Sequence, residues 1–139
     1  MTVEWSRVRH FDPSEWQKDP ARVDPALVYL VDDLREYVGR PIVIHVAWDD
    51  ARHAEDSAHY DRPCTAVDLH IKGLNLCDQW LAAERFPFSG IGLYPSWAAP
   101  GLHVDIRPNP EHPTVGRRWW RDQVGSYHAL NRAFLKTIV

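Results

Sequence analysis

Apolar positions along the chain change between helical and strand spacing. Between Asp24 and Gly39 they recur at steps of three and four residues, which predicts a helix with one buried face. Asp24 is a suitable N-cap, the proline after it suits the first helical turn, and Gly39 is a typical helix stop. The short β-branched run over residues 41–48 then predicts a strand.

The remaining pattern predicts three more strands and two more helices. We expect strands over residues 65–71, 90–93 and 102–107, and helices over residues 74–85 and 127–138. In the first of these strands Asp68 and His70 share one face with Ala66, and the aliphatic residues between them form the other face. Residues 49–57 and 108–116 are expected to be loops. The predicted fold class is α+β, with a small, mainly antiparallel four-stranded sheet and helices packed on one side.

Length and charge narrow the class of protein. The 139 residues suit a single domain over residues 1–139, in which residues 1–20 form an ordered but irregular arm. With a net charge of −3, nothing electrostatic argues for binding to nucleic acid, whose usual footprint is a basic patch. No apolar run is long enough for membrane insertion. The N-terminus lacks the pattern of a signal peptide, so we expect synthesis in the cytoplasm.

Histidine and aspartate residues in three segments suggest metal chemistry. Ser57-Ala58-His59 is followed by Ala66-Val67-Asp68, and a later strand carries His103-Val104-Asp105. Two imidazoles and one carboxylate are a standard ligand set for a catalytic zinc ion. The same set also suits non-haem iron, but the His-x-Asp…His order usual in those oxygenases is absent.

These segments resemble the D-alanyl-D-alanine carboxypeptidase family of zinc peptidases, in the wider group with lysostaphin-type enzymes and the hedgehog fold. The first family motif corresponds to Ser57, His59, Ala66 and Asp68, and the second to His103. The branch with a Gly-Ile-Gly-x-Tyr-Pro strand before a His-Val-Asp-x-Arg strand, common in bacteriophages and prophages, is especially similar. The resemblance covers about residues 40–120 and implies one zinc ion held by His59, Asp68 and His103.

The chain departs from the family pattern at three points. The spacing from His59 to Asp68 is longer than usual, and Cys64 stands where a glycine is usual. Pro100 stands where many members carry an acidic general base, three residues before the last histidine. Cys64 is therefore either a small residue in a tight loop, the favoured interpretation, or an additional thiolate ligand.

Asp105 and Arg107 are the candidate catalytic residues beside the metal. In a strand, His103, Asp105 and Arg107 share one face and point at one cavity. Asp105 is either the general base, a partner of a ligand histidine, or a salt-bridge partner of Arg107. Arg107 either holds a substrate carboxylate or only neutralises Asp105.

The remaining histidines and aromatic residues have weaker functional signals. His70 is either a structural residue or a partner of the site, and His45 fits a half-buried strand position. Trp97 lies in the turn between the two site strands, where an aromatic ring can form a wall of a cleft. Trp119 and Trp120 are expected to clamp the C-terminal segment against the sheet.

The resemblance implies a zinc-dependent peptidase that cleaves peptidoglycan stem peptides, as a carboxypeptidase or an endopeptidase, with a water activated by the ion as nucleophile. A phage lysis or tail-associated enzyme would reach the cell wall by a route other than a signal peptide. The alternative is a non-catalytic metal-binding module with a structural or assembly role in a phage particle, which the missing acid at position 100 favours.

Overall fold

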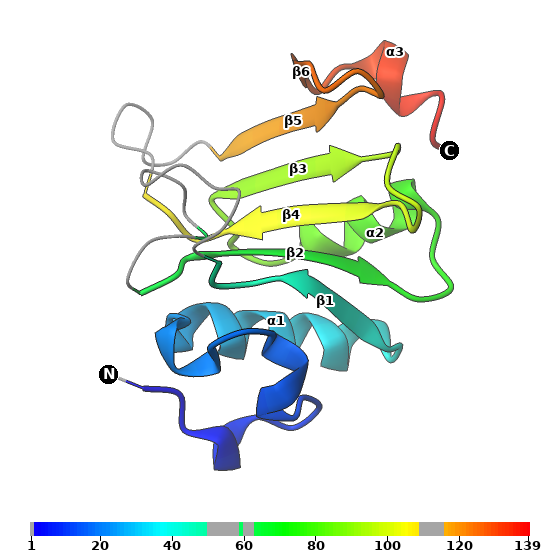
Figure 1. Cartoon of the computed structure of the whole chain (residues 1–139). Helices are drawn as coiled ribbons and strands as arrows, with labels where there is room; N and C mark the ends of the chain where they lie inside the picture. Colours follow the sequence, from blue (N-terminus) through cyan, green and yellow to red (C-terminus); the bar gives the residue numbers. More distant parts are fainter. Residues whose placement is uncertain (1, 50–58, 60–62, 109–115) are drawn as a thin grey trace.

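A six-stranded mixed sheet forms the centre of the molecule (Figure 1). The structure is a computed structural model that describes residues 2–49, 59, 63–108 and 116–139. The strands follow the order β1-β2-β4-β3-β5-β6, and each neighbouring pair is antiparallel except β3 and β5. Their bounds are β1 Ile42–Val46, β2 Ala66–Ile71, β3 Gly90–Tyr94, β4 Gly101–Asp105, β5 Arg117–Arg121 and β6 Tyr127–Ala129. The α+β class is confirmed, but the expectation of four strands is wrong.

The first two α-helices begin and end close to where local sequence signals predict. Helix α1 spans Pro25–Val38; the Asp24 side chain accepts a hydrogen bond from the backbone of Ala26, and Gly39 ends the helix in the left-handed region at φ 63°. Helix α2 spans Leu76–Ala83 and is capped by Asn75. In Figure 1, α2 lies behind the sheet, where it contacts β3 and β4.

The C-terminal segment differs from the prediction. Instead of one helix over residues 127–138, the chain forms strand β6 and then the short helix α3, Arg132–Leu135. The reason is a hairpin between β5 and β6. The Asp122 carboxylate accepts hydrogen bonds from the backbone of Val124 and Ser126, and Gly125 has a φ of 93°. This turn returns the chain alongside β5.

The N-terminal arm is built from three 3-10 turns, at Trp5–Arg7, Pro13–Trp16 and Pro20–Arg22. It also contributes to the core. The Trp16 side chain is fully buried and packs edge to face against Phe11. Just after the arm, Val23 forms a parallel bridge with Cys64, which fixes the segment that enters β2.

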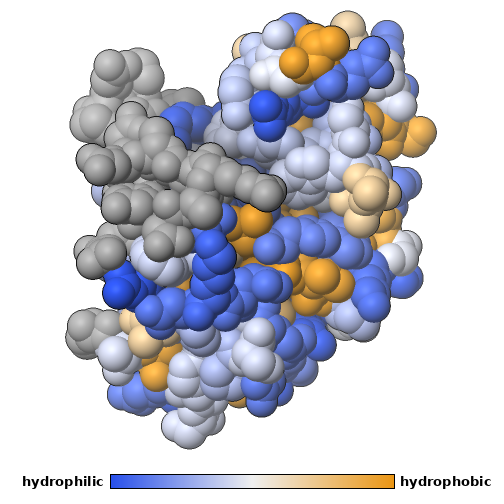
Figure 2. All heavy atoms as spheres, viewed as in Figure 1, coloured by the Kyte–Doolittle hydropathy of each residue, from blue (hydrophilic) through white to orange (hydrophobic). Residues whose placement is uncertain are grey.

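The two faces of β2 separate the core from the site. Val67, Leu69 and Ile71 point into the apolar core, while Asp68 and His70 are on the opposite face, as the alternation predicts. Hydrophilic residues cover most of the described surface in the orientation of Figure 2, with smaller hydrophobic patches between them. None of the helices in the described ranges has the length and apolar character needed to cross a bilayer.

Several sequence-based expectations lie outside the described residues. They concern Ser57, most of the loop expected at 49–57, most of the loop expected at 108–116, and residues 60–62 between the two halves of the first motif.

Candidate metal centre

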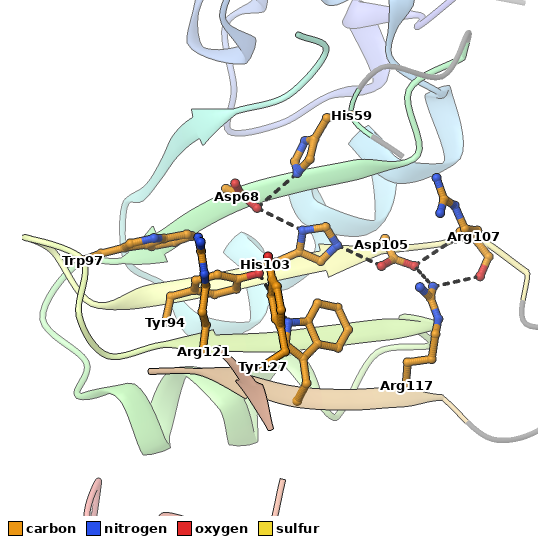
Figure 3. Close-up of a pocket in the computed structure, with 11 residues that line it drawn as sticks. His59, Asp68, Tyr94, Trp97, His103, Asp105, Arg107, Arg117, Arg121 and Tyr127 are labelled. Carbon is orange, nitrogen blue, oxygen red and sulfur yellow. Dashed lines mark hydrogen bonds and ion pairs between the residues drawn. The ribbon is translucent and has the colours of Figure 1, made fainter. Parts of the chain in front are cut away.

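Three side chains that are far apart in the sequence converge on one point (Figure 3). Asp68 on β2 and His103 on β4 are directly opposite partners in the antiparallel pairing. The Nδ1 atom of His103 lies 3.0 Å from Oδ1 of Asp68, and Nε2 of His59 lies 3.3 Å from the same oxygen. One donor atom from each residue lies within 4.8 Å of the other two. Ligands of a tetrahedral zinc ion, bonded at about 2.1 Å, are separated by about 3.4 Å, so this group is a candidate metal site.

His59 is held in place by the end of β1. Its Nδ1 atom donates a hydrogen bond to the carbonyl oxygen of Ala47 at 3.0 Å, and its own carbonyl accepts from the backbone N–H of Asp49 at 3.1 Å. Because a carbonyl oxygen only accepts, Nδ1 carries the proton and Nε2 is the atom that can offer a lone pair. The buried His59 therefore presents the correct nitrogen toward Asp68.

His103 lies between two carboxylates. Its Nε2 atom faces Oδ2 of Asp105 at 2.9 Å and its Nδ1 atom faces Oδ1 of Asp68 at 3.0 Å, so Nδ1 is the nitrogen that would bind an ion held by Asp68, with Nε2 left to donate to Asp105. A ligand histidine in metalloproteins usually donates its outer N–H to a carboxylate or a carbonyl in this way. The carbonyl of Ala47 and the carboxylate of Asp105 thus hold the two rings in orientations that suit metal binding.

The pKa values follow from these contacts. Burial raises the pKa of Asp68, but hydrogen bonds with His103 and His59 outweigh burial and hold that pKa well below its usual range. Burial lowers the pKa of His103, but its hydrogen bonds with Asp105 and Asp68 raise it to about 9. The pocket therefore favours a positive charge beside Asp68, which either an imidazolium proton or a cation at the same point would provide.

Asp105 is buried and accepts hydrogen bonds from three donors. Besides His103, it accepts from the backbone N–H of Arg107 at 3.1 Å and from the guanidinium of Arg117. Burial raises its pKa, but the contacts with His103 and Arg117 lower it overall. With 1% of its side chain exposed and the His103 ring between it and Asp68, Asp105 has the geometry of a partner of a ligand histidine more than that of a general base.

Two glycines of β3 make room for the partners of His103. Gly90 pairs with Asp105 and Gly92 pairs with His103 in the sheet register. A Cβ atom at Gly90 would overlap the Asp105 carboxylate, and one at Gly92 would overlap the indole of Trp119. The two glycines in the strand that precedes the His103 motif are therefore explained by the close approach of side chains.

The candidate metal site lies in a cleft of about 580 Å³. One wall is aromatic: Tyr94 and Trp97 stack with ring centroids 4.4 Å apart, and Trp119 donates a hydrogen bond to the Tyr94 hydroxyl at 3.3 Å. Burial raises the pKa of Tyr94 to about 12. The other residues that line the cleft beside the three candidate ligands are Asp105, Arg107, Arg117, Arg121 and Tyr127.

Sequence reasoning placed six residues in the cleft and missed others. His59, Asp68, His103, Asp105 and Arg107 all line it, and Trp97 contributes a wall as expected. Arg117, Trp119, Arg121 and Tyr127 were not anticipated in this role. The sequence offers little signal for them, because Arg-Arg-Trp-Trp-Arg at 117–121 does not alternate between polar and apolar residues. Arg117, Trp119 and Arg121 share one face only because the segment forms a strand.

Cys64 is not part of this group of ligands. Its side chain is buried beside the entry to β2, where the thiol contacts the carbonyl of Ala66 at 3.1 Å. The backbone of Cys64 bonds to Arg22 and to Asp24. These contacts agree with the interpretation of Cys64 as a small residue in a tight loop.

Comparisons with protein-family models, with curated proteins and with solved structures found no match for this chain. The resemblance to the zinc peptidase family therefore rests on the sequence motifs alone.

Proposed function

We propose that the protein is a zinc-dependent peptidase that acts on the stem peptides of peptidoglycan. The observation that carries the proposal is the arrangement of His59, Asp68 and His103, in which each imidazole has its outer nitrogen bonded to an oxygen and its inner nitrogen directed at one carboxylate. Two nitrogens and one carboxylate oxygen fit zinc, with a fourth position left for substrate or water.

A zinc ion bound there would acidify a water molecule and polarise a peptide carbonyl. The chain's own contribution is to orient the ligands and shape the cleft. Asp105 fixes the tautomer of His103, and the main chain at Ala47 fixes that of His59. Tyr94 and Trp97 supply a flat apolar wall against which a peptide can lie.

The charge of the cleft supports a substrate that carries carboxylates. Arg107, Arg117 and Arg121 line it, against the two carboxylates of Asp68 and Asp105. Arg117 pairs with Asp105, and Asp68 faces the two histidines. A peptide with a C-terminal or side-chain carboxylate would meet a cationic lining, and guanidinium groups bind carboxylates in a bidentate manner.

The test is to incubate zinc-loaded protein with purified muropeptides and to follow new amino groups by mass spectrometry. We expect cleavage that a chelator stops and that His103→Ala abolishes. His10→Ala is the matched control, because His10 is a half-exposed histidine paired with Glu36 away from the cleft. Wild-type cleavage by His103→Ala would overturn the assignment of the site.

The second candidate is a non-catalytic metal-binding module of phage origin. It is favoured by one observation: among the described residues that line the cleft, the only carboxylates are Asp68 and Asp105, and both are engaged by histidines. Neither carboxylate can take a proton from a reacting water without giving up its contact with a histidine. Stoichiometric zinc without any cleavage of muropeptides would favour this module over the peptidase.

A further inference from the structure

A second pair of histidines lies outside the candidate metal centre. His45 on β1 and His70 on β2 come from adjacent antiparallel strands, next to an irregularity of pairing between Ile44 and Val46. Nε2 of His45 lies 2.6 Å from Nδ1 of His70. The ring centroids are 4.8 Å apart and the ring planes are inclined by 20°. Two imidazole nitrogens from two strands thus face each other.

Among the residues that the structure describes, this pair has no acidic partner. In the described part of the chain, no carboxylate forms an ion pair with either ring, unlike His59, His103, His10 and His128. His45 also makes an edge contact with the indole of Trp97, at 6.0 Å between ring centroids. A hydrogen bond between two neutral rings uses one nitrogen as donor and the other as acceptor. The same two atoms can instead both bind one metal ion.

The geometry needs only a small adjustment for that. Imidazole nitrogens bind zinc at about 2.0–2.1 Å, so two of them on one tetrahedral ion lie about 3.3 Å apart. The pair must therefore open by well under 1 Å from its 2.6 Å separation. His45 is exposed and can rotate toward solvent, where water would complete the coordination.

We propose that His45 and His70 form a second transition-metal site, distinct from the group of His59, Asp68 and His103. With two neutral nitrogens and no carboxylate, it would bind more weakly than the first site and would prefer Cu²⁺ over Zn²⁺, following the general order of affinity for nitrogen ligands. This proposal does not depend on the proposed peptidase activity. Its ion would lie beside Trp97, which lines the main cleft.

The test is to measure bound metal and tryptophan fluorescence during titration of the untagged, full-length protein with Cu²⁺ and, separately, with Zn²⁺. We expect wild-type protein to bind two Cu²⁺ ions, the weaker of which quenches Trp97. His45→Gln and His70→Gln should each lose that weaker ion, and His103→Ala should lose only the tighter one. Trp97→Phe should keep both ions and lose the quenching associated with the weaker one.

His10→Gln is the control for a general effect of removing a histidine and should bind as many ions as wild type. Circular dichroism establishes that each variant is folded, and the more exposed His45 gives a second variant if substitution of His70 disturbs the sheet. Two outcomes would overturn the proposal. One is a wild-type protein whose only bound ion is lost in His103→Ala, and the other is a folded His45→Gln variant that binds as many ions as the wild type.

Discussion

Replacing Asp105 with asparagine separates the two roles that this residue could have. The substitution is nearly isosteric but removes the charge, and it leaves one carbonyl oxygen to serve donors from His103, Arg107 and Arg117. If Asp105 orients His103, the outer N–H of the ligand loses its fixed acceptor. Loss of such a partner lowers metal affinity by about 10–100-fold, equivalent to about 1.4–2.7 kcal/mol. If Asp105 is instead the general base, the substitution would leave metal affinity unchanged and lower the rate by about 10²–10⁴-fold.

The assay is zinc affinity by competition with a chromogenic chelator, followed by muropeptide cleavage at saturating zinc. We expect Asp105→Asn to bind zinc about 10–100-fold more weakly. The matched control is Asp122→Asn, because Asp122 also accepts from a histidine, His128, at 2.8 Å but lies outside the cleft. An Asp105→Asn protein with wild-type zinc affinity and a rate reduced by two or more orders of magnitude would refute the orienting role and identify Asp105 as the general base.

The remaining predictions concern a ligand, the strand that backs the site, and pH. His59→Ala should lose stoichiometric zinc in equilibrium dialysis, whereas His10→Ala should keep it; retention of zinc by His59→Ala would remove His59 from the ligand set. Gly90→Ala should lower zinc affinity without removing any polar group, because the new methyl overlaps the Asp105 carboxylate; unchanged affinity would mean that the position of this carboxylate is unimportant. The pKa of Tyr94, raised to about 12 by burial, exceeds the value of about 10 for an unfolded chain. Its contribution to stability is therefore fully present below pH 10 and is lost as the pH rises toward 12, because the unfolded state releases the proton first. Urea unfolding across this range should show a smaller decline for Tyr94→Phe than for wild type, and equal declines would contradict the raised pKa.

Local signals in the sequence predicted the elements whose structure is decided locally. Helix α1 depends on its own apolar spacing, on Asp24 as the cap and on Gly39 as the stop, and all three could be recognised without knowledge of the rest of the chain. The alternation in β2 likewise separates the core face from the site face. Each of these signals depends on residues that are close together in the sequence.

The C-terminal part could not be predicted in the same way because its structure depends on distant partners. Every residue of β5 is only half-buried, so the strand has no buried apolar run, and it pairs in parallel with β3, which precedes it by more than twenty residues. The apolar spacing of Leu130, Phe134 and Leu135 resembles a helix. This spacing predicts a helix over the whole segment 127–138. Over residues 127–129, however, backbone pairing with β5 outweighs the helical preference.

The candidate site shows the same limit. The motifs identified His59, Asp68 and His103 as a set, but not the atoms through which they meet. Their meeting depends on the register of β2 against β4, which places Asp68 opposite His103. A shift of that register by one residue would turn Asp68 or His103 toward the core. The sequence contains no signal for this register apart from the apolar faces that both strands must bury.

The glycines of β3 connect the motif to the site in physical terms. In a strand, glycine packs poorly and usually marks a place where something else comes close. At Gly90 that group is the carboxylate that orients His103, and at Gly92 it is the indole that contacts the same ring from β5, at 5.2 Å between ring centroids. The two glycines therefore allow His103 to be surrounded on two sides while its Nδ1 atom stays directed at Asp68. In this chain, the two glycines of the family-like sequence pattern provide the space that the neighbours of His103 require.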